Sequence, residues 1–365
     1  MPAIKRRDAI VYGGYAAAFV VLAIAKSSGL SPMVIFVLGI VALALGAMAV
    51  GEATTKLSHR LSPAATGVVQ SVLGNLPELF LAIFALQAGL YSVVAAAIIG
   101  SVLGNLLFVL GLALVVGGFR HGRLQFSSGN NNLYATVLLL GVAALIVPFL
   151  ATQVGAPDFG HANELSAVVA ITLLVIFAIS IPIFLRLPQA GPGTRPDVDE
   201  EGKPEHPPSP LLPTVVTLAV SAGSAAFVAD WFVEALQPAM ASIGMSEAFA
   251  GLIVIALAGN AVENLVAISA AWHNRADLSL ALVLNSALQI VLFLAPVLVL
   301  LSFLVAPAPL TLVFTPLLLG VLAVSVILVF AIVLDGEANA LEGAMLLGLY
   351  VIIAAAVYWG PQIHG

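Results

Sequence analysis

Two copies of one polar motif interrupt long apolar stretches of this chain. Residues 74–78 read Gly-Asn-Leu-Pro-Glu and residues 259–263 read Gly-Asn-Ala-Val-Glu, so a Gly-Asn-x-x-Glu pattern recurs at an offset of 185 positions. An ionisable side chain at membrane depth is energetically costly, and its presence there marks a candidate functional site. Because a helix-loosening Gly-Asn pair precedes each Glu, we interpret the two motifs as one ion site built twice.

Both motifs offer oxygen atoms to a cation. Glu78 and Glu263 would supply two carboxylates, and the loosened helices would free backbone carbonyl groups. The candidate ligands are Glu78, Glu263, Asn75, Asn260, Gly74, Gly259, Ser101 and Ser286. Two negative charges in a flexible oxygen cage suit a hard divalent cation, and Ca²⁺ better than Mg²⁺. The chain has no cysteine and no histidine near mid-span, which disfavours a transition-metal site.

The two carboxylates also indicate a transport mechanism. Two bare carboxylates in a poorly solvated site repel each other, so the site becomes neutral either by binding Ca²⁺ or by binding protons. If only neutral forms reorient across the membrane, Ca²⁺ moves one way and protons move the other. This charge balance predicts a proton-coupled antiporter that works by alternating access.

The composition places these motifs in a membrane protein. The chain of 365 residues is 61% hydrophobic and only 8% charged, which is far more apolar than a soluble domain requires. Lys5-Arg6-Arg7 before the first apolar run resembles the start of a signal peptide, but no cleavage site followed by a soluble domain is present, so we interpret that run as a transmembrane helix. Eleven spans are predicted, at 8–26, 31–51, 64–88, 91–118, 132–151, 163–185, 211–236, 247–272, 277–305, 309–334 and 340–360.

The basic residues orient the predicted spans. With a cytoplasmic N-terminus, only Lys26 falls outside. The cytoplasmic set is Lys5, Arg6, Arg7, Lys56, Arg60, Arg120, Arg123, Arg186, Arg195, Lys203 and Arg275. This asymmetry follows the positive-inside rule, supports the number of spans and places the C-terminus outside. The short loops are typical of a prokaryotic plasma (inner) membrane protein.

The motif offset extends into a repeat. Ser101, Leu107 and Phe108 meet Ser286, Leu292 and Phe293 at the same offset of 185 positions. We predict an all-α polytopic membrane protein with two five-helix repeats of inverted topology after a lone first helix. Its parts are a first transmembrane helix at 1–30, a first repeat at 31–187 (helices 2–6), an acidic Pro-rich cytoplasmic linker at 188–210 and a second repeat at 211–365 (helices 7–11).

The predicted depth of the two glutamates supports a cation site, whereas the other polar residues of the spans have two possible interpretations each. Glu78 and Glu263 lie about fifteen and seventeen residues into their spans, which places both near the bilayer midplane at 1.5 Å per residue. Small and polar residues also join helices in membranes, so Ser101, Ser286, Asn105 and Gln289 are either ligands or packing residues. Glu52, Asp230 and Glu234 near helix ends are either interfacial or part of an ion path. The linker is either a solvated loop or a Ca²⁺ sensor.

The motifs resemble those of the Ca²⁺/H⁺ exchangers, the cation exchanger family within the Ca²⁺:cation antiporter superfamily. The resemblance covers nearly the whole chain. It rests on the two Gly-Asn-x-x-Glu motifs, the 100–107 run Gly-Ser-Val-Leu-Gly-Asn-Leu-Leu, Asn285-Ser286-x-x-Gln289-Ile290, the 334–343 run Leu-Asp-Gly-Glu-Ala-Asn-Ala-Leu-Glu-Gly and the acidic linker. It implies an eleven-helix exchanger driven by the proton gradient, with Glu78 and Glu263 as the central ligands, assisted by Asn75, Asn260 and nearby carbonyls.

Three other classes compete with this interpretation. A Na⁺/Ca²⁺ or Na⁺(K⁺)/H⁺ exchanger would share the fold, and a first motif reading Leu-Pro-Glu leans toward the Na⁺/Ca²⁺ branch. A passive channel is compatible with broken helices, but inverted repeats around a carboxylate pair favour gated access. An enzyme would need a nucleophile and a base or a His-Glu-x-x-His motif, and the sequence has none. The expected partners are Ca²⁺ as the transported substrate, protons and the lipid bilayer, with no cofactor and no nucleic acid.

Overall fold

The computed structural model describes residues 2–58, 61, 69–70, 72–153, 160–184 and 210–359, with the backbone alone for 2–7, 128 and 261–263. Nearly all of this part of the chain is helical, so the predicted all-α membrane fold is confirmed. The elements of the first half are α1 (Pro2–Ser27), α2 (Pro32–Ser58), α4 (Leu76–Gln87), α5 (Tyr91–Leu103), η1 (Gly104–Val109), α6 (Leu110–His121), β1 (Leu124–Gln125), α7 (Ser128–Gln153) and α8 (Ala162–Phe184).

The second half begins at α9 (Leu211–Ile243), and the acidic linker predicted at 188–210 lies, except for Pro210, outside the described residues. The remaining elements are α10 (Glu247–Phe249), η2 (Ala250–Ile255), α11 (Ala256–Gly259), α12 (Ala261–Trp272), α13 (Ala276–Gln289), η3 (Ile290–Leu294), α14 (Ala295–Val305), α15 (Pro316–Asp335), β2 (Glu337–Ala338) and α16 (Ala340–Trp359). The segments named η are π-helical turns inside longer helices.

Within the described residues, nine helices are long and apolar enough to cross a membrane, or ten if the bent segment 247–272 counts as one span. The third predicted span, 64–88, includes residues outside the described set, and α4 forms its final part. The total of eleven spans therefore stays a prediction. Several described helices extend beyond their predicted ends, because helical structure continues past the last apolar residue of the span.

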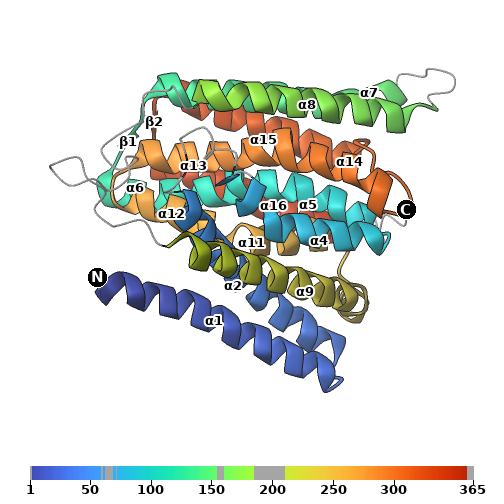
Figure 1. Cartoon of the computed structure of the whole chain (residues 1–365). Helices are drawn as coiled ribbons and strands as arrows, with labels where there is room; N and C mark the ends of the chain where they lie inside the picture. Colours follow the sequence, from blue (N-terminus) through green and yellow to red (C-terminus); the bar gives the residue numbers. More distant parts are fainter. Residues whose placement is uncertain are drawn as a thin grey trace.

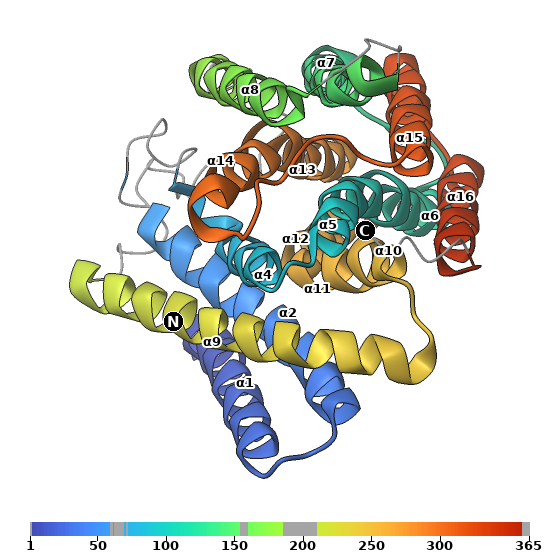
Figure 2. The same ribbon diagram turned by 90° about the vertical axis from the view of Figure 1, so that its right-hand side faces the viewer.

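The helices form one bundle with recognisable layers. Figure 1 shows α7 and α8 along one edge and α1 along the opposite edge. Figure 2 shows α4, α5, α12, α13 and α14 in the middle, with α7, α8 and α15 on one side and α1, α2 and α9 on the other. The central helices include both motif helices, α4 and α12, so the two Gly-Asn-x-x-Glu motifs lie inside the bundle rather than at its lipid-facing edge.

The backbone repeats at the offset seen in the sequence. α4 and α12 begin directly after Asn75 and Asn260, and the π-helical segments η1 and η3 follow α5 and α13 at equivalent places. Contacts between helices match as well. α6 packs on α12 and α16, and its counterpart α14 packs on α4 and α8, the counterparts of α12 and α16. These matching breaks and contacts are those expected of two repeats, while the two five-helix repeats and their inversion across the membrane stay predictions.

A short ribbon marks one end of the bundle. β1 pairs antiparallel with β2, with Leu124 opposite Ala338. At the same end, the Asp277 carboxylate accepts a hydrogen bond from the Ser127 backbone N–H at 2.5 Å. We call this end, which also holds the start of α1, the ribbon end; α16 ends at the opposite end (Figure 1).

Charged residues near helix ends bind α1 to α2 and α9. The Lys56 ammonium group lies 2.7 Å from Asp8 and 3.9 Å from Glu52, and Lys26 pairs with Glu234 at 2.5 Å. Lys26 and Lys56 lie in the last turns of α1 and α2, and the paired side chains are partly exposed. They favour the interfacial interpretation of Glu52 and Glu234 over a place in the ion path.

The backbones of α5 and η2 approach each other closely where the two segments cross. A Cβ atom on Gly100 would lie 2.3 Å from the Leu252 carbonyl oxygen, and one on Gly251 would lie 2.3 Å from the Val93 carbonyl oxygen. Glycine on each helix therefore permits direct backbone contact, as is common where membrane helices cross. This crossing fixes α5, which carries Ser101, against the helix that leads into the second motif.

We predict that Gly100→Val destabilises the fold. The added side chain must push α5 away from η2, and overpacking of this kind costs about 1–3 kcal/mol. Thermal unfolding in detergent measures the change. The matched control is Gly320→Val on α15, because no atom of the described chain outside its own helix backbone lies within 4 Å of a Cβ there. Equal melting temperatures for the two variants would contradict the prediction.

Candidate cation site

The helices are interrupted at both motifs. Asn75 precedes α4 with φ −90° and ψ 9°, and Asn260 separates α11 from α12 with φ −95° and ψ 12°. The axes of segments 247–259 and 264–272 differ by 65°. A break of this kind leaves N–H groups at the start of the next helix and carbonyl groups at the end of the previous one without helical partners. Such groups at membrane depth line a site rather than lipid.

Glu78 occupies the first turn of α4, after Pro77. The positive end of a helix dipole stabilises a carboxylate at this position. Pro77 suits the start of a helix, because its missing N–H would have no helical partner there. The motif thus places a carboxylate at the helix start inside the bundle, where the side chain is half-buried.

The two motifs meet directly. The Asn260 amide Nδ2 donates a hydrogen bond to Glu78 Oε1 at 2.5 Å, and it also lies 3.3 Å from the Ala256 carbonyl oxygen. Asn260 is buried. Residues that are 182 positions apart in the sequence therefore share one site.

Asn75 makes a similar connection to the other half of the chain. Its Nδ2 donates to Gln289 Oε1 at 3.0 Å, and Gln289 is the last residue of α13 before η3. Asn75 is buried. Each motif asparagine thus donates a hydrogen bond to a side chain of the opposite repeat. Gln289, for which the sequence allows a ligand or a packing role, positions Asn75.

The two motif glycines differ in their surroundings. A Cβ on Gly259 would lie 2.6 Å from Glu78 Cγ and 2.7 Å from Glu78 Oε1, whereas a Cβ on Gly74 would meet no described atom beyond its own helix backbone within 4 Å. Gly259 therefore makes room for the carboxylate of the other repeat. At Gly74, which the sequence treats as equivalent, no described side chain takes up the matching space.

The two candidate serines are both buried, but only Ser101 shares a cavity with Glu78. Ser101 on α5 and Glu78 are the polar residues of a narrow cavity. Its other lining residues are apolar: Leu81, Ala82, Ala85, Val93, Val94, Ala97, Ile98, Ile255, Leu294 and Leu298. Asn105 donates from Nδ2 to the Ser101 carbonyl oxygen at 2.8 Å, which supports a packing role for Asn105. Ser286 lies at the equivalent place on α13 and is equally buried.

Glu263 can be placed only by its backbone, which lies in the first turn of α12, as Glu78 lies in the first turn of α4. Its side chain lies outside the described residues. Among the described side chains, no three His, Asp or Glu residues gather into a group that could hold a metal ion.

Comparison with known proteins fits this geometry. A family model described as sodium/calcium exchanger protein matches residues 31–186 and 213–359. The chain belongs to the sodium/calcium exchanger family. The two matched segments each contain one motif, and α1 precedes the first of them.

Several members of this exchanger family are similar along most of the chain. A Ca²⁺/H⁺ antiporter of Synechocystis is 34% identical over 348 residues, which cover 90% of this chain and 92% of that protein. The Ca²⁺/H⁺ antiporter ChaA of Bacillus subtilis is 34% identical and covers 84% and 87%. Members of this family are transporters, so the prediction that the protein is not an enzyme is confirmed.

Solved structures of exchangers share the fold. The structure of native YfkE matches with a TM-score of 0.80 and 29% identity, over 95% of this chain and 99% of that one. The H⁺/Ca²⁺ exchanger CAX matches with a TM-score of 0.76 at 16% identity, over 96% and 92%. The sodium-calcium exchanger NCX_Mj matches with a TM-score of 0.54 at 20% identity, over 88% and 97%. At these identities, the last two likenesses concern the fold alone.

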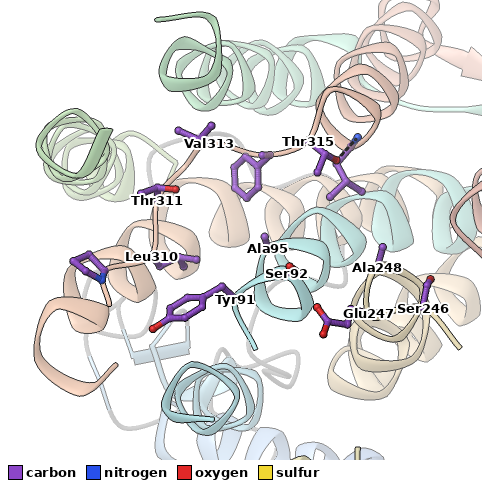
Figure 3. Close-up of a pocket in the computed structure, with 13 residues that line it drawn as sticks. Tyr91, Ser92, Ala95, Ser246, Glu247, Ala248, Leu310, Thr311, Val313 and Thr315 are labelled. Carbon is purple, nitrogen blue, oxygen red and sulfur yellow. Dashed lines mark hydrogen bonds between the residues drawn. The ribbon is translucent and has the colours of Figure 1, made fainter. Parts of the chain in front are cut away.

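A second cavity of this exchanger lies near the end opposite the ribbon, and sequence reasoning did not indicate it. Figure 3 shows Glu247 of α10 beside Tyr91 and Ser92 of α5, with Thr311 and Thr315 across the space. Its α5 residues differ from those that line the Glu78 cavity, so the two cavities lie on different faces of that helix. Glu247 is the only carboxylate among its lining residues, so this cavity does not offer the paired charges of the motif site.

Proposed function

We propose that the chain is a secondary-active antiporter that moves Ca²⁺ in exchange for protons at a midplane site. The observation that carries the proposal is the contact between Glu78 of the first motif and Asn260 of the second. Because this contact joins two helix breaks inside an apolar bundle, a cation there is reached by both halves of the protein. Alternating access of one central site follows when the halves rock against each other.

The proposed ligands all supply oxygen. Glu78 and Glu263 are the central carboxylates. The side-chain oxygens of Asn75, Asn260, Ser101 and Ser286 and the backbone carbonyl groups at Gly74 and Gly259 complete the cage. Such a mixed set of carboxylate, amide, hydroxyl and carbonyl oxygens is typical of Ca²⁺ sites.

Proton coupling follows from the charge of this site. With Ca²⁺ bound, two carboxylates are neutralised; without it, protons must neutralise them before the empty protein reorients through an apolar bundle. The protein therefore carries Ca²⁺ in one direction and protons in the other. The names of the Synechocystis and Bacillus subtilis relatives support this choice of ions.

The alternative is a Na⁺/Ca²⁺ or Na⁺(K⁺)/H⁺ exchanger of the same fold. The Leu-Pro-Glu of the first motif favours it, but the likeness to a sodium-calcium exchanger is limited to the fold at 20% identity. The relatives at 34% identity are named Ca²⁺/H⁺ antiporters. We therefore place the Ca²⁺/H⁺ reaction first.

We place the protein in the inner membrane of a prokaryote, with the ribbon end in the cytoplasm and the C-terminus outside. There, protons that enter down their gradient would drive the export of Ca²⁺. The positive-inside rule supports this orientation. Arg120, Arg123 and Arg275 lie in or beside the turns of the ribbon end, and Lys26 lies at the opposite end of α1.

Flux measurements test the proposed reaction. In proteoliposomes without Na⁺, an imposed pH gradient should drive Ca²⁺ uptake, and an ionophore that collapses the gradient should stop it. Protein-free liposomes give the background leak. Flux that ignores the pH gradient and requires a Na⁺ gradient would contradict the proposal and assign the chain to the alternative reaction.

A further inference from the structure

Several buried polar atoms have no hydrogen-bond partner within the described part of the chain, and two of them lie on the helices that join the motif site to the ribbon end. They are Asn264 Oδ1 on α12 and Ser279 Oγ on α13. Their exposed fractions are 8% and 2%. A buried polar atom without a partner costs free energy, and in native proteins it calls for an explanation such as water or an ion.

Both residues lie between the motif site and the ribbon end. Asn264 is one turn after Asn260 along α12, and its N–H donates to the Asn260 carbonyl oxygen at 3.1 Å. Ser279 is two turns before Ser286 on α13, which places it about 10 Å nearer the start of that helix. α13 starts at the ribbon end, where Asp277 accepts the hydrogen bond from Ser127. Asn264 Oδ1 and Ser279 Oγ therefore lie on the side of the motif site that faces the ribbon end.

The first half carries apolar residues at the equivalent positions. The offset of 185 places Leu79 opposite Asn264 and Val94 opposite Ser279. Val94 lines the Glu78 cavity, whose walls are apolar except for Glu78 and Ser101. The two halves match at the motif residues and at both serines, so this difference concerns the route to the site rather than the site itself.

We propose that Asn264 and Ser279 line the ribbon-end half of the ion pathway and bind the partly hydrated cation on its way to the motif site. This inference rests on the proposed function. A divalent cation that leaves water needs oxygen atoms in place of the water molecules that it loses. It therefore gives up its water molecules more readily along a polar wall than along an apolar one. The two oxygens lower the barrier on one side of the membrane only, and the apolar half-path keeps the opposite side slower.

Exchanging residues between the repeats tests the proposal. Asn264→Leu and Ser279→Val place the side chains of the first half in the second half. Ca²⁺ uptake is measured in everted and right-side-out membrane vesicles, so that Ca²⁺ reaches one face at a time. We expect the apparent KM for Ca²⁺ to rise about five-fold at the ribbon-end face and to change less than about two-fold at the other face. The maximal rate should change little.

The control is Ser180→Val on α8, whose hydroxyl group donates to the Phe177 carbonyl oxygen. It should leave KM unchanged at both faces. Asn264→Ser provides a second variant if Asn264→Leu folds poorly. In detergent, the Ca²⁺ affinity of the variants should match that of the wild type, because both faces of the protein are open there. An equal rise of KM at both faces, or none, would overturn the proposal. Wild-type vesicles measured in parallel with pH and Na⁺ gradients separate this failure from failure of the proposed Ca²⁺/H⁺ reaction.

Discussion

Replacement of Glu78 by glutamine is expected to abolish proton-driven Ca²⁺ transport. The substitution keeps the shape of the side chain but removes one of two carboxylates, so bound Ca²⁺ would carry an uncompensated charge in an apolar bundle. Breaking a buried charge pair costs about 3–5 kcal/mol. Since each 1.4 kcal/mol is a factor of ten, Ca²⁺ affinity should fall at least about a hundred-fold. Isothermal titration in detergent measures affinity, and proteoliposomes with an imposed pH gradient measure flux.

Glu247→Gln is the matched control for Glu78→Gln. It removes a half-buried carboxylate from the cavity on another face of α5, so flux should stay within about two-fold of the wild type, as expected for a substitution outside the site. Glu263→Gln should behave like Glu78→Gln if the motifs form one site. Wild-type flux in Glu78→Gln would exclude the carboxylate site, whereas equal losses in Glu78→Gln and Glu247→Gln would indicate a general effect on folding.

The sequence predicts local breaks in this protein well, because their causes are local. Glycine and asparagine at 74–75 and 259–260 disfavour a continuous helix, and the structure interrupts the helices at both places. The apolar composition likewise predicts the membrane fold. Helix ends are predicted less well: α2 continues to Ser58, past the predicted end at 51, because Glu52 and Lys56 form an ion pair and Lys56 reaches Asp8.

Contacts between the two halves of the chain could not be predicted from the sequence. Asn260 with Glu78 and Asn75 with Gln289 depend on how α4, α12 and α13 pack, and no spacing rule connects residues so far apart. The π-helical turns η1 and η3 were not predicted either, because the apolar pattern of a span does not distinguish a single π-helical turn from the α-helix around it. The sequence indicates the repeat through its two motifs, but it does not indicate that equivalent residues have different neighbours.

Gly259 gives the sharpest case of that difference, and Gly259→Ala is expected to slow Ca²⁺ transport strongly. A Cβ there would lie 2.6 Å from Glu78 Cγ, too close for any real contact, so Glu78 must move or α11 must shift. A displacement of about 1 Å at a reacting group can cost about a hundred-fold in rate, and we expect initial uptake to fall at least about ten-fold. Initial rates in proteoliposomes and melting temperatures in detergent are measured together, because the protein should stay folded.

Gly74→Ala separates two explanations for the motif glycines. A methyl group at Gly74 meets no described atom beyond its own helix backbone within 4 Å, so this variant should transport within about two-fold of the wild type. If both glycines served only to loosen a helix, alanine would be equally harmful at the two positions. A loss confined to Gly259→Ala would mean that the second glycine is required because the carboxylate of the first repeat occupies the space beside it. Equal losses would instead assign both glycines to the helix breaks.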